Sequence, residues 1–307
     1  MTEKFFKLNN GTCIPAIGLG TWQSSPRQVK LAVTHALLNG YKHIDAAYCY
    51  DNEVEVGQGL AAAFQAGIQR KDVFVTTKLW STFHSRVEEA VDESLENLGL
   101  DYVDLYLMHW PVAMNPKGNH PLFPKLPDGS RDIDRSWSYL KTYQLMEKLL
   151  DTGKVKAIGV ANFSVRYLGE LLRQVSVVPA VNQIESHPFL PQHDVIDFCK
   201  QKGIHITAYS PLGSAGSPLL TEESIQKIAD KYRVSSSTIL ISFHISRGLS
   251  VLAKSVNPSR INFNKEVVHI GCEDLNTLKR LAAERGFVTR YVYPAFGVDF
   301  GFLDKSD

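Results

Sequence analysis

Short runs of Val, Ile and other apolar residues alternate along the chain with segments in which apolar positions recur every three or four residues. The short runs predict strands buried on both faces, and the periodic segments predict amphipathic helices. Two helical stripes, Val29 to Leu37 and Val87 to Leu98, are followed by Gly40 and Gly99, residues that favour helix ends. The predicted strands are 17–20, the short run ending at Asp45, 73–77, 103–108, 155–160, 180–183, 204–209 and 250–253.

This alternation of eight strands with helices predicts an α/β protein with a closed (β/α)8 fold, the TIM barrel. We expect residues 1–307 to form a single domain, because barrels of this length commonly remain one domain and no linker interrupts the pattern. An open doubly wound sheet is the alternative fold. Its nucleotide-binding fingerprint needs a third glycine and a following helix, and Gly18 to Gln23 provides neither.

Two segments outside the alternating pattern are expected to lie over the carboxyl-end rim of the barrel. Residues 111–135 are rich in Pro, Gly, Asn and Asp and have no periodicity, which predicts a long βα loop. Residues 287–307 form a C-terminal tail near the site, although core packing is the commoner role for tail aromatics. The aromatic residues of this tail include Tyr293, Phe296, Phe300 and Phe302.

Composition and charge bear on the compartment and the partners. The 307 residues are 44% hydrophobic, and 33 Lys and Arg oppose 32 Asp and Glu, so neither nucleic acid nor a membrane is expected as a partner. No apolar stretch is long enough to span a bilayer, and the charges in Met1 to Lys7 do not suit a secretory signal, which predicts a cytoplasmic protein. The cysteines have no disulfide or zinc spacing and no HExxH is present, so we predict reduced thiols and no metal.

Four complementary polar residues fall at or near the carboxyl ends of predicted strands. Asp45 ends one strand, and Lys78 and His109 each follow another. Tyr50 comes shortly after Asp45, so all four side chains are expected to meet at one rim of a parallel barrel. Each alone has an ordinary structural interpretation, such as an ion pair, a half-buried aromatic or a core imidazole. Together they favour a proton-transfer site, because burying ionisable groups without partners is costly.

A phenol beside an ammonium suits reduction of a carbonyl group by hydride, since the developing alkoxide needs a proton. The ordinary pKa of tyrosine is about 10, and a charge about 4 Å away contributes up to roughly 4 kcal/mol, or about three pK units, at an effective dielectric of about 20. We therefore expect Lys78 to lower the pKa of Tyr50. Asp45 would pair with Lys78 and offset part of this effect, and His109 would orient the carbonyl oxygen.

The chain resembles the aldo-keto reductase family across nearly its whole length. The resemblance is carried by Gly40 to Gly57, which includes Tyr50, Asn52 and Glu53, by Phe74 to Trp80 and by Leu100 to Pro111. It implies that Tyr50 is the general acid and that His109 orients the substrate. It also implies that Lys78 and Asp45 tune the phenol.

The same resemblance implies NADP(H) as the cofactor. Lys254 and Arg260 match adenosine-site positions, where two cations suit the 2′-phosphate, although isolated residues of these types are usually solvated surface charges. Ala161, Ala253 and Phe263 depart from the family pattern, in which Ser, Pro and an acidic residue are common. The implied cofactor-binding residues are Thr21, Trp22, Asp45, Asn162, Gln183, Tyr209, Ser210, Leu212, Ser214, Lys254, Ser255, Val256, Asn257, Arg260 and Asn264.

An apolar substrate pocket is expected beside the polar residues, with core packing as the alternative for its aromatic members. Cys49 is a candidate for this pocket, although a buried, inert thiol is the favoured interpretation. The expected lining is Trp22, Cys49, Trp80, His109, Trp110, Phe123 and Phe296. The resemblance is strongest to fungal glycerol dehydrogenases and glyceraldehyde reductases that use NADP. It implies reduction of aldehydes or ketones to alcohols, with small hydroxy-aldehydes such as glyceraldehyde first and sugars or uronates also open.

Two other functions remain as alternatives. The same barrel could be a cofactor-sensing binding subunit without significant turnover, since a fold does not establish activity. A metal-dependent barrel hydrolase is less well supported. For the reductase we expect a monomer or weak dimer whose partners are small carbonyl and alcohol substrates.

Overall fold

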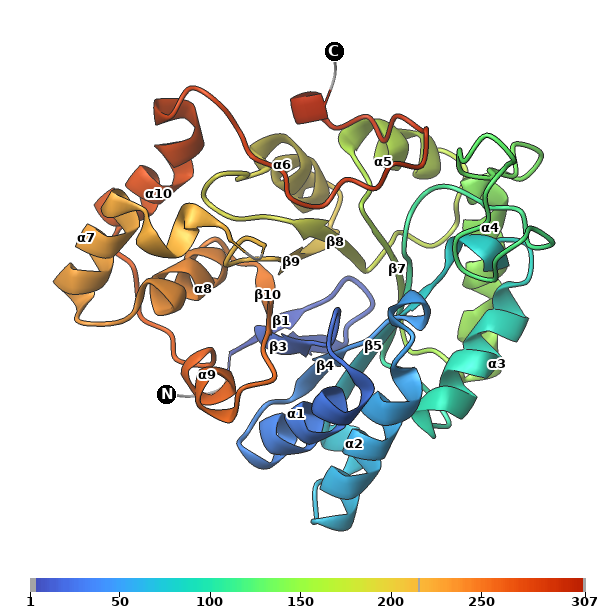
Figure 1. Cartoon of the computed structure of the whole chain (residues 1–307), viewed down its shortest axis with the longest axis horizontal. Coiled ribbons are helices and arrows are strands. Elements are labelled where there is room, and N and C mark those ends of the chain that lie inside the picture. Colours follow the sequence, from blue (N-terminus) through green and yellow to red (C-terminus); the bar gives the residue numbers. More distant parts are fainter. Residues whose placement is uncertain (1–3, 215, 306–307) are drawn as a thin grey trace.

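Eight parallel strands form a closed barrel in the computed structural model, which describes residues 4–214 and 216–305 (Figure 1). Each strand pairs with its neighbour in chain order, and β10 closes the ring against β3. All eight predicted strands are present, so the predicted barrel is confirmed. Their bounds are β3 (Ile17–Gly20), β4 (His43–Asp45), β5 (Phe74–Leu79), β6 (Leu105–Met108), β7 (Ile158–Ala161), β8 (Val181–Glu185), β9 (His205–Tyr209) and β10 (Ser250–Lys254).

Helices surround this barrel in Figure 1 and bury their apolar sides against it. Both predicted stripes are buried, on α1 and α3. Gly40 and Gly99 follow these helices with φ of +94° and +65°, a left-handed conformation that glycine adopts without a steric penalty. The α-helices of the described residues are α1 (Pro26–Leu38), α2 (Glu53–Gln65), α3 (Val87–Leu98), α4 (Tyr139–Leu149), α5 (Val165–Leu171), α6 (His193–Gln201), α7 (Glu223–Tyr232), α8 (Ser236–Ser246), α9 (Pro258–Phe263) and α10 (Cys272–Glu284).

An antiparallel hairpin of β1 (Phe5–Lys7) and β2 (Cys13–Pro15) precedes the barrel and was not predicted. Its Ile14 is fully buried in a cluster with Phe74 and Leu105, which begin two barrel strands, so the hairpin covers the amino ends of the barrel. Both strands are short and partly exposed, so they lack the buried apolar run that marks the barrel strands, and the sequence did not reveal them.

The long loop and the tail both contribute to the carboxyl-end side of the barrel. Residues 111–135 have no helix or strand, as predicted, and the backbone oxygen of Leu122 accepts a hydrogen bond from Trp80 Nε1 at 2.6 Å. Phe300 and Phe302 of the tail are buried in the core. Residues 306 and 307 of the predicted tail lie outside the described residues. Among the residues described, none of the helices combines the length and apolarity needed to span a bilayer.

Candidate active site

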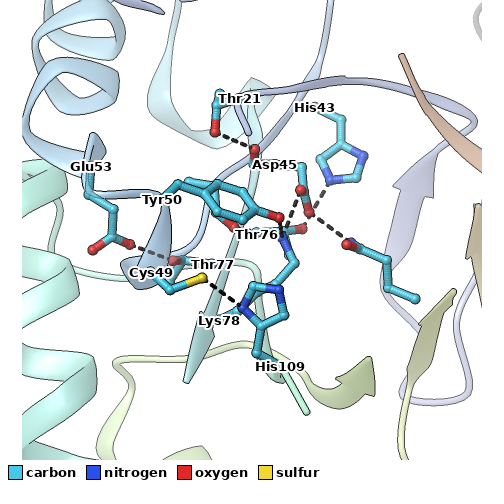
Figure 2. Close-up of polar contacts among 12 residues, drawn as sticks. Thr21, His43, Asp45, Cys49, Tyr50, Glu53, Thr76, Thr77, Lys78 and His109 are labelled. Atoms are coloured by element: carbon cyan, nitrogen blue, oxygen red, sulfur yellow. Dashed lines mark hydrogen bonds and ion pairs between the residues drawn. The ribbon is translucent and has the colours of Figure 1, made fainter. Parts of the chain in front are cut away.

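Asp45 and Lys78 form a buried ion pair at the carboxyl-end rim (Figure 2). Asp45 ends β4, while Lys78 lies within β5, one residue before its end and not after it as predicted. The strand continues because Lys78 points inward, where Nζ donates to Asp45 Oδ2 at 2.7 Å and to the Ala46 carbonyl at 2.8 Å. Neither side chain is more than 4% exposed, so each charge depends on the other for compensation.

Tyr50 reaches this pair from a short 3-10 turn, η1 (Tyr48–Tyr50), between β4 and α2. Lys78 Nζ donates a hydrogen bond to Tyr50 Oη at 3.2 Å. The following Asn52 is buried and donates to the backbone oxygens of Thr21 and Ser24 at 3.0 and 3.1 Å, which fixes the turn against the loop after β3. The tyrosine is therefore held by backbone geometry as well as by the lysine.

The pKa of Tyr50 differs in direction from the sequence prediction. Burial, followed by the nearby Asp45 carboxylate, raises the pKa of the phenol well above its ordinary value. The expected lowering by Lys78 is therefore wrong as a net result, because loss of solvation and the carboxylate act against the ammonium. The phenol is protonated at neutral pH and can serve as a proton donor.

His109 follows β6 directly and lies edge-on to the Tyr50 ring, with ring centroids 5.7 Å apart. Burial, with the Lys78 ammonium acting in the same direction, lowers the pKa of His109 well below its ordinary value. The imidazole is therefore neutral at physiological pH, and one ring nitrogen can donate a hydrogen bond while the other accepts one. Its Nδ1 lies 3.4 Å from Cys49 Sγ.

A cavity of about 630 Å³ opens at this rim and falls within the usual size range of small-molecule sites. It brings together most of the predicted site residues, and Lys78 is reached from it through Tyr50. The predicted residues that line it are Thr21, Trp22, Asp45, Cys49, Tyr50, Trp80, His109, Trp110, Phe123, Asn162, Gln183, Tyr209, Ser210, Leu212, Ser214, Lys254, Arg260 and Phe296.

Four predicted cofactor residues, Ser255, Val256, Asn257 and Asn264, are not among the lining residues. Asn257 caps α9, because its Oδ1 accepts a hydrogen bond from the Arg260 amide at 3.1 Å. Ser255 Oγ in turn accepts one from the Asn257 amide at 3.1 Å. Ser255 and Asn257 thus shape the start of α9, which presents Arg260 to the cavity.

Two buried amide side chains extend the polar network of the cavity. Gln183 Nε2 donates to Asp45 Oδ1 at 2.8 Å, so both oxygens of this carboxylate have partners. Asn162 Nδ2 donates to the His109 carbonyl at 2.9 Å, and Tyr209 Oη donates to Asn162 Oδ1 at 2.8 Å. Asn162 has φ of +63°, an unfavourable conformation that the surrounding bonds maintain at the site.

Aromatic rings form the apolar part of the cavity. Trp80, Trp110 and Phe296 are nearly buried, and Phe296 lies 6.3 Å from Trp80 and 6.0 Å from Trp110 between ring centroids. Trp22 and Phe123 are 39% and 36% exposed, so they form the outer lip. These five rings make a cup with a closed base and an open edge.

Cys49 lies in the cavity wall, and burial raises the pKa of its thiol. The thiol is therefore protonated and a weak nucleophile. This chemistry agrees with the expected inert cysteine, although the side chain lines the cavity.

Several cavity residues escaped sequence reasoning. Val292 comes from the tail, and Ser217 and Leu220 come from the segment after β9. Their types carry no chemical signal, since apolar residues and serine are common in any loop. Glu185 was also missed. It does not line the cavity, but it is a fully buried carboxylate two positions beyond Gln183, and an acidic residue this close to the end of a predicted strand was a detectable signal.

Comparisons with known proteins agree with this geometry. The Aldo/keto reductase family model matches residues 16–282. A D-galacturonate reductase from Hypocrea jecorina is 56% identical over 309 residues, covering 100% of both chains. A glycerol 2-dehydrogenase (NADP(+)) from Saccharomyces cerevisiae is 48% identical over 300 residues, covering 95% of each.

A solved aldose reductase from Schistosoma japonicum superposes with a TM-score of 0.92 and 36% identity, covering 99% of this chain and 100% of that one. The matches therefore include both the barrel and the rim that carries the site. The chain belongs to the aldo/keto reductase family.

Proposed function

We propose that the chain is an NADP(H)-dependent reductase that converts aldehydes or ketones to alcohols. The observation that carries this proposal is the protonated phenol of Tyr50, which accepts a hydrogen bond from the buried Lys78 ammonium beside the neutral imidazole of His109. Tyr50 and His109 line one end of a cavity of small-molecule size, and Lys78 contacts Tyr50 from outside the cavity lining. When bound, a reduced nicotinamide would supply the hydride.

Tyr50 is the proposed proton donor. Its oxygen accepts from Lys78, so its own hydrogen is free to point at a substrate oxygen. As the proton leaves, the new phenolate attracts the ammonium by up to roughly 4 kcal/mol at about 4 Å and an effective dielectric of about 20. This attraction develops only during proton transfer and therefore stabilises the transition state more than the ground state.

Asp45 and His109 have supporting roles in this proposal. The Asp45 carboxylate is 2.7 Å from Lys78 Nζ and holds this amine in place beside Tyr50. The neutral imidazole of His109 can donate an N–H to the carbonyl oxygen and orient it toward Tyr50. The site would thus hold the oxygen between two donors.

The residues of the cavity fit an NADP(H) molecule. Asn162 and Gln183 line the cavity and offer amide groups for a carboxamide, and Tyr209, also in the lining, offers an aromatic face for a nicotinamide ring. Lys254 and Arg260 line the same cavity and would hold a phosphate by charge-assisted hydrogen bonds. The yeast relative is named as an NADP(+) enzyme, which supports the same cofactor.

Small hydroxy-aldehydes such as glyceraldehyde, together with sugars and uronates, are the proposed substrates. One relative is named for D-galacturonate and another for glycerol, which are hydroxylated compounds of different size. The aromatic cup of Trp80, Trp110 and Phe296 provides apolar walls for the carbon skeleton, and its open lip leaves room for longer chains.

Replacement of Tyr50 by Phe tests the proposal. We expect kcat for glyceraldehyde reduction, followed by NADPH absorbance, to fall about a hundredfold or more, because the proton donor is removed. NADPH binding, measured by quenching of protein fluorescence, should change little. Tyr48→Phe in the same turn is the matched control.

Near-normal turnover by Tyr50→Phe would disprove the role of this tyrosine. Tight NADPH binding by the unaltered protein without turnover of any carbonyl would instead favour the cofactor-sensing alternative.

A further inference from the structure

We propose that Glu185 is a positioning residue that holds the tail wall of the substrate cavity and thereby sets the preference among carbonyl substrates. The tail wall is defined as Val292, Pro294 and Phe296, the tail residues that line the cavity. The inference rests on the proposed reductase function and adds a residue that determines substrate selectivity.

Glu185 reaches the tail because of its place at the end of β8. Side chains two positions apart on a strand point to the same side, so Glu185 follows the direction of Gln183, which lines the cavity. Its Cα is in register with Tyr209 on β9, another lining residue. Glu185 is nevertheless fully buried, since the tail crosses the barrel at this point.

Both carboxylate oxygens of Glu185 bind the tail backbone. Oε1 accepts a hydrogen bond from the Tyr291 amide and Oε2 accepts one from the Val292 amide, each at 2.8 Å. His187 Nε2 lies 2.9 Å from Oε1, which adds a third partner. Two successive amides on one carboxylate fix both the position and the direction of the chain that enters the tail wall.

Other contacts hold the segment on either side of this point. Thr289 donates its amide to the Phe189 carbonyl at 2.9 Å, and Tyr291 Oη lies 2.9 Å from Ser217 Oγ. Arg290 binds Asp304 through Nε at 2.8 Å and Nη2 at 2.6 Å. Loss of the Glu185 contacts would therefore shift the tail wall locally without releasing the whole tail.

A shift of the tail wall would act on the substrate cup and not on the proton donor. Phe296 closes the cup through its ring contacts with Trp80 and Trp110. The hydrogen bonds of Tyr50 and Lys78 come from Asp45, Ala46 and each other. A small aldehyde needs only the proton-donor end of the cavity, whereas a large one also needs the cup.

Glu185→Gln tests the inference because it keeps the side-chain shape but places an amide donor opposite one backbone N–H donor. We expect kcat/KM for para-nitrobenzaldehyde to fall about tenfold more than kcat/KM for glyceraldehyde, mainly through KM. Hydrogen exchange at the amides of residues 291 and 292 should become faster at the same time.

Glu147→Gln is the matched control. Glu147 also binds two successive backbone amides, those of Ser176 and Val177, both at 2.7 Å, but it does not line the cavity. Replacement of Glu147 should leave the ratio of the kcat/KM values for the two aldehydes unchanged. Glu185→Asp keeps the negative charge on a shorter side chain and should change the ratio of kcat/KM values in the same direction by a smaller factor. If Glu185→Gln does not fold, Glu185→Asp takes its place in the test.

The outcomes separate this inference from the proposed function. Faster hydrogen exchange in the tail of Glu185→Gln, with an unchanged ratio of kcat/KM values for the two aldehydes, would overturn the role of Glu185 in selectivity. An equal fall in kcat/KM for both aldehydes would overturn it as well. If the unaltered protein reduces no carbonyl, the proposed function fails. The exchange measurement would then still decide whether Glu185 holds the tail.

Discussion

The stability of the folded protein is expected to depend on the protonation of one buried carboxyl group, that of Glu53. It begins α2, shortly after Tyr50, and is 3% exposed. Its carboxyl group accepts hydrogen bonds from Thr77 Oγ1, beside Lys78 on β5, and from Ser94 Oγ on α3. Glu53 therefore joins the turn that carries the phenol to the strand that carries the ammonium, as Figure 2 shows for Thr77.

Burial is the largest influence on Glu53 and raises its pKa from 4.5 to about 7, although hydroxyl donors act in the opposite direction. In the unfolded chain the group loses its proton near its ordinary pKa, while in the folded chain it keeps the proton to a higher pH. The contribution of Glu53 to the free energy of unfolding is therefore fully present at low pH. It falls as the pH rises from 4.5 to about 7 and is constant above that range. The shift corresponds to about 3 kcal/mol.

Glu53→Gln should remove this pH dependence, because the amide resembles the protonated carboxyl and does not titrate. We expect the stability of the variant relative to the unaltered protein to increase by about 3 kcal/mol in all, mostly as the pH rises from 4.5 to about 7. Urea unfolding followed by circular dichroism at a series of pH values measures this difference, with Glu55→Gln on the same helix as the control.

Other buried groups do not affect the comparison. Burial lowers the pKa of His43 to about 3 and that of His205 to about 4, so their neutral forms add stability as pH rises toward the ordinary value of 6.5. These contributions occur in both proteins and cancel in the difference. A difference that stays flat with pH would refute the reasoning, since the pKa of Glu53 would then be the same in the folded and unfolded chains.

Three further predictions concern the cofactor cations, one helix contact and the buried ion pair. Lys254→Ala and Arg260→Ala should each weaken NADPH binding about tenfold or more and NADH binding much less, because a charge-assisted bond to the 2′-phosphate is lost; equal losses in fluorescence titrations would contradict that contact. Gly57→Ala should lower the free energy of unfolding, measured with urea, by about 1–3 kcal/mol, because the added Cβ would lie 2.6 Å from the Leu98 carbonyl oxygen. Gly169→Ala is the control: its Cβ would enter open space in α5, so this replacement should stabilise the protein slightly. Lys78→Met should lower stability by about 3–5 kcal/mol in the same assay, because it leaves the partner carboxylate buried without its cation, and a smaller loss would show that water compensates that charge.

The order of apolar runs and periodic segments along the chain is sufficient to predict the barrel. The sequence alone was enough to find the four polar residues of the site, Asp45, Tyr50, Lys78 and His109. The carboxyl ends of the strands in a parallel barrel share one rim, so residues at the ends of different strands are predicted to lie close together. The spacings alone do not identify the cofactor-binding residues of the cavity, and only the family resemblance implied their roles.

Only the tertiary structure decided the energetics at that rim and the walls around it. The pKa of Tyr50 rises because the phenol is buried and the Asp45 carboxylate is near, and both influences depend on distances and solvent access. Glu185 meets the amides of Tyr291 and Val292 across more than a hundred residues of chain, and no local pattern encodes such a contact. Local periodicity specifies elements, whereas desolvation and long-range pairing exist only once the elements have packed.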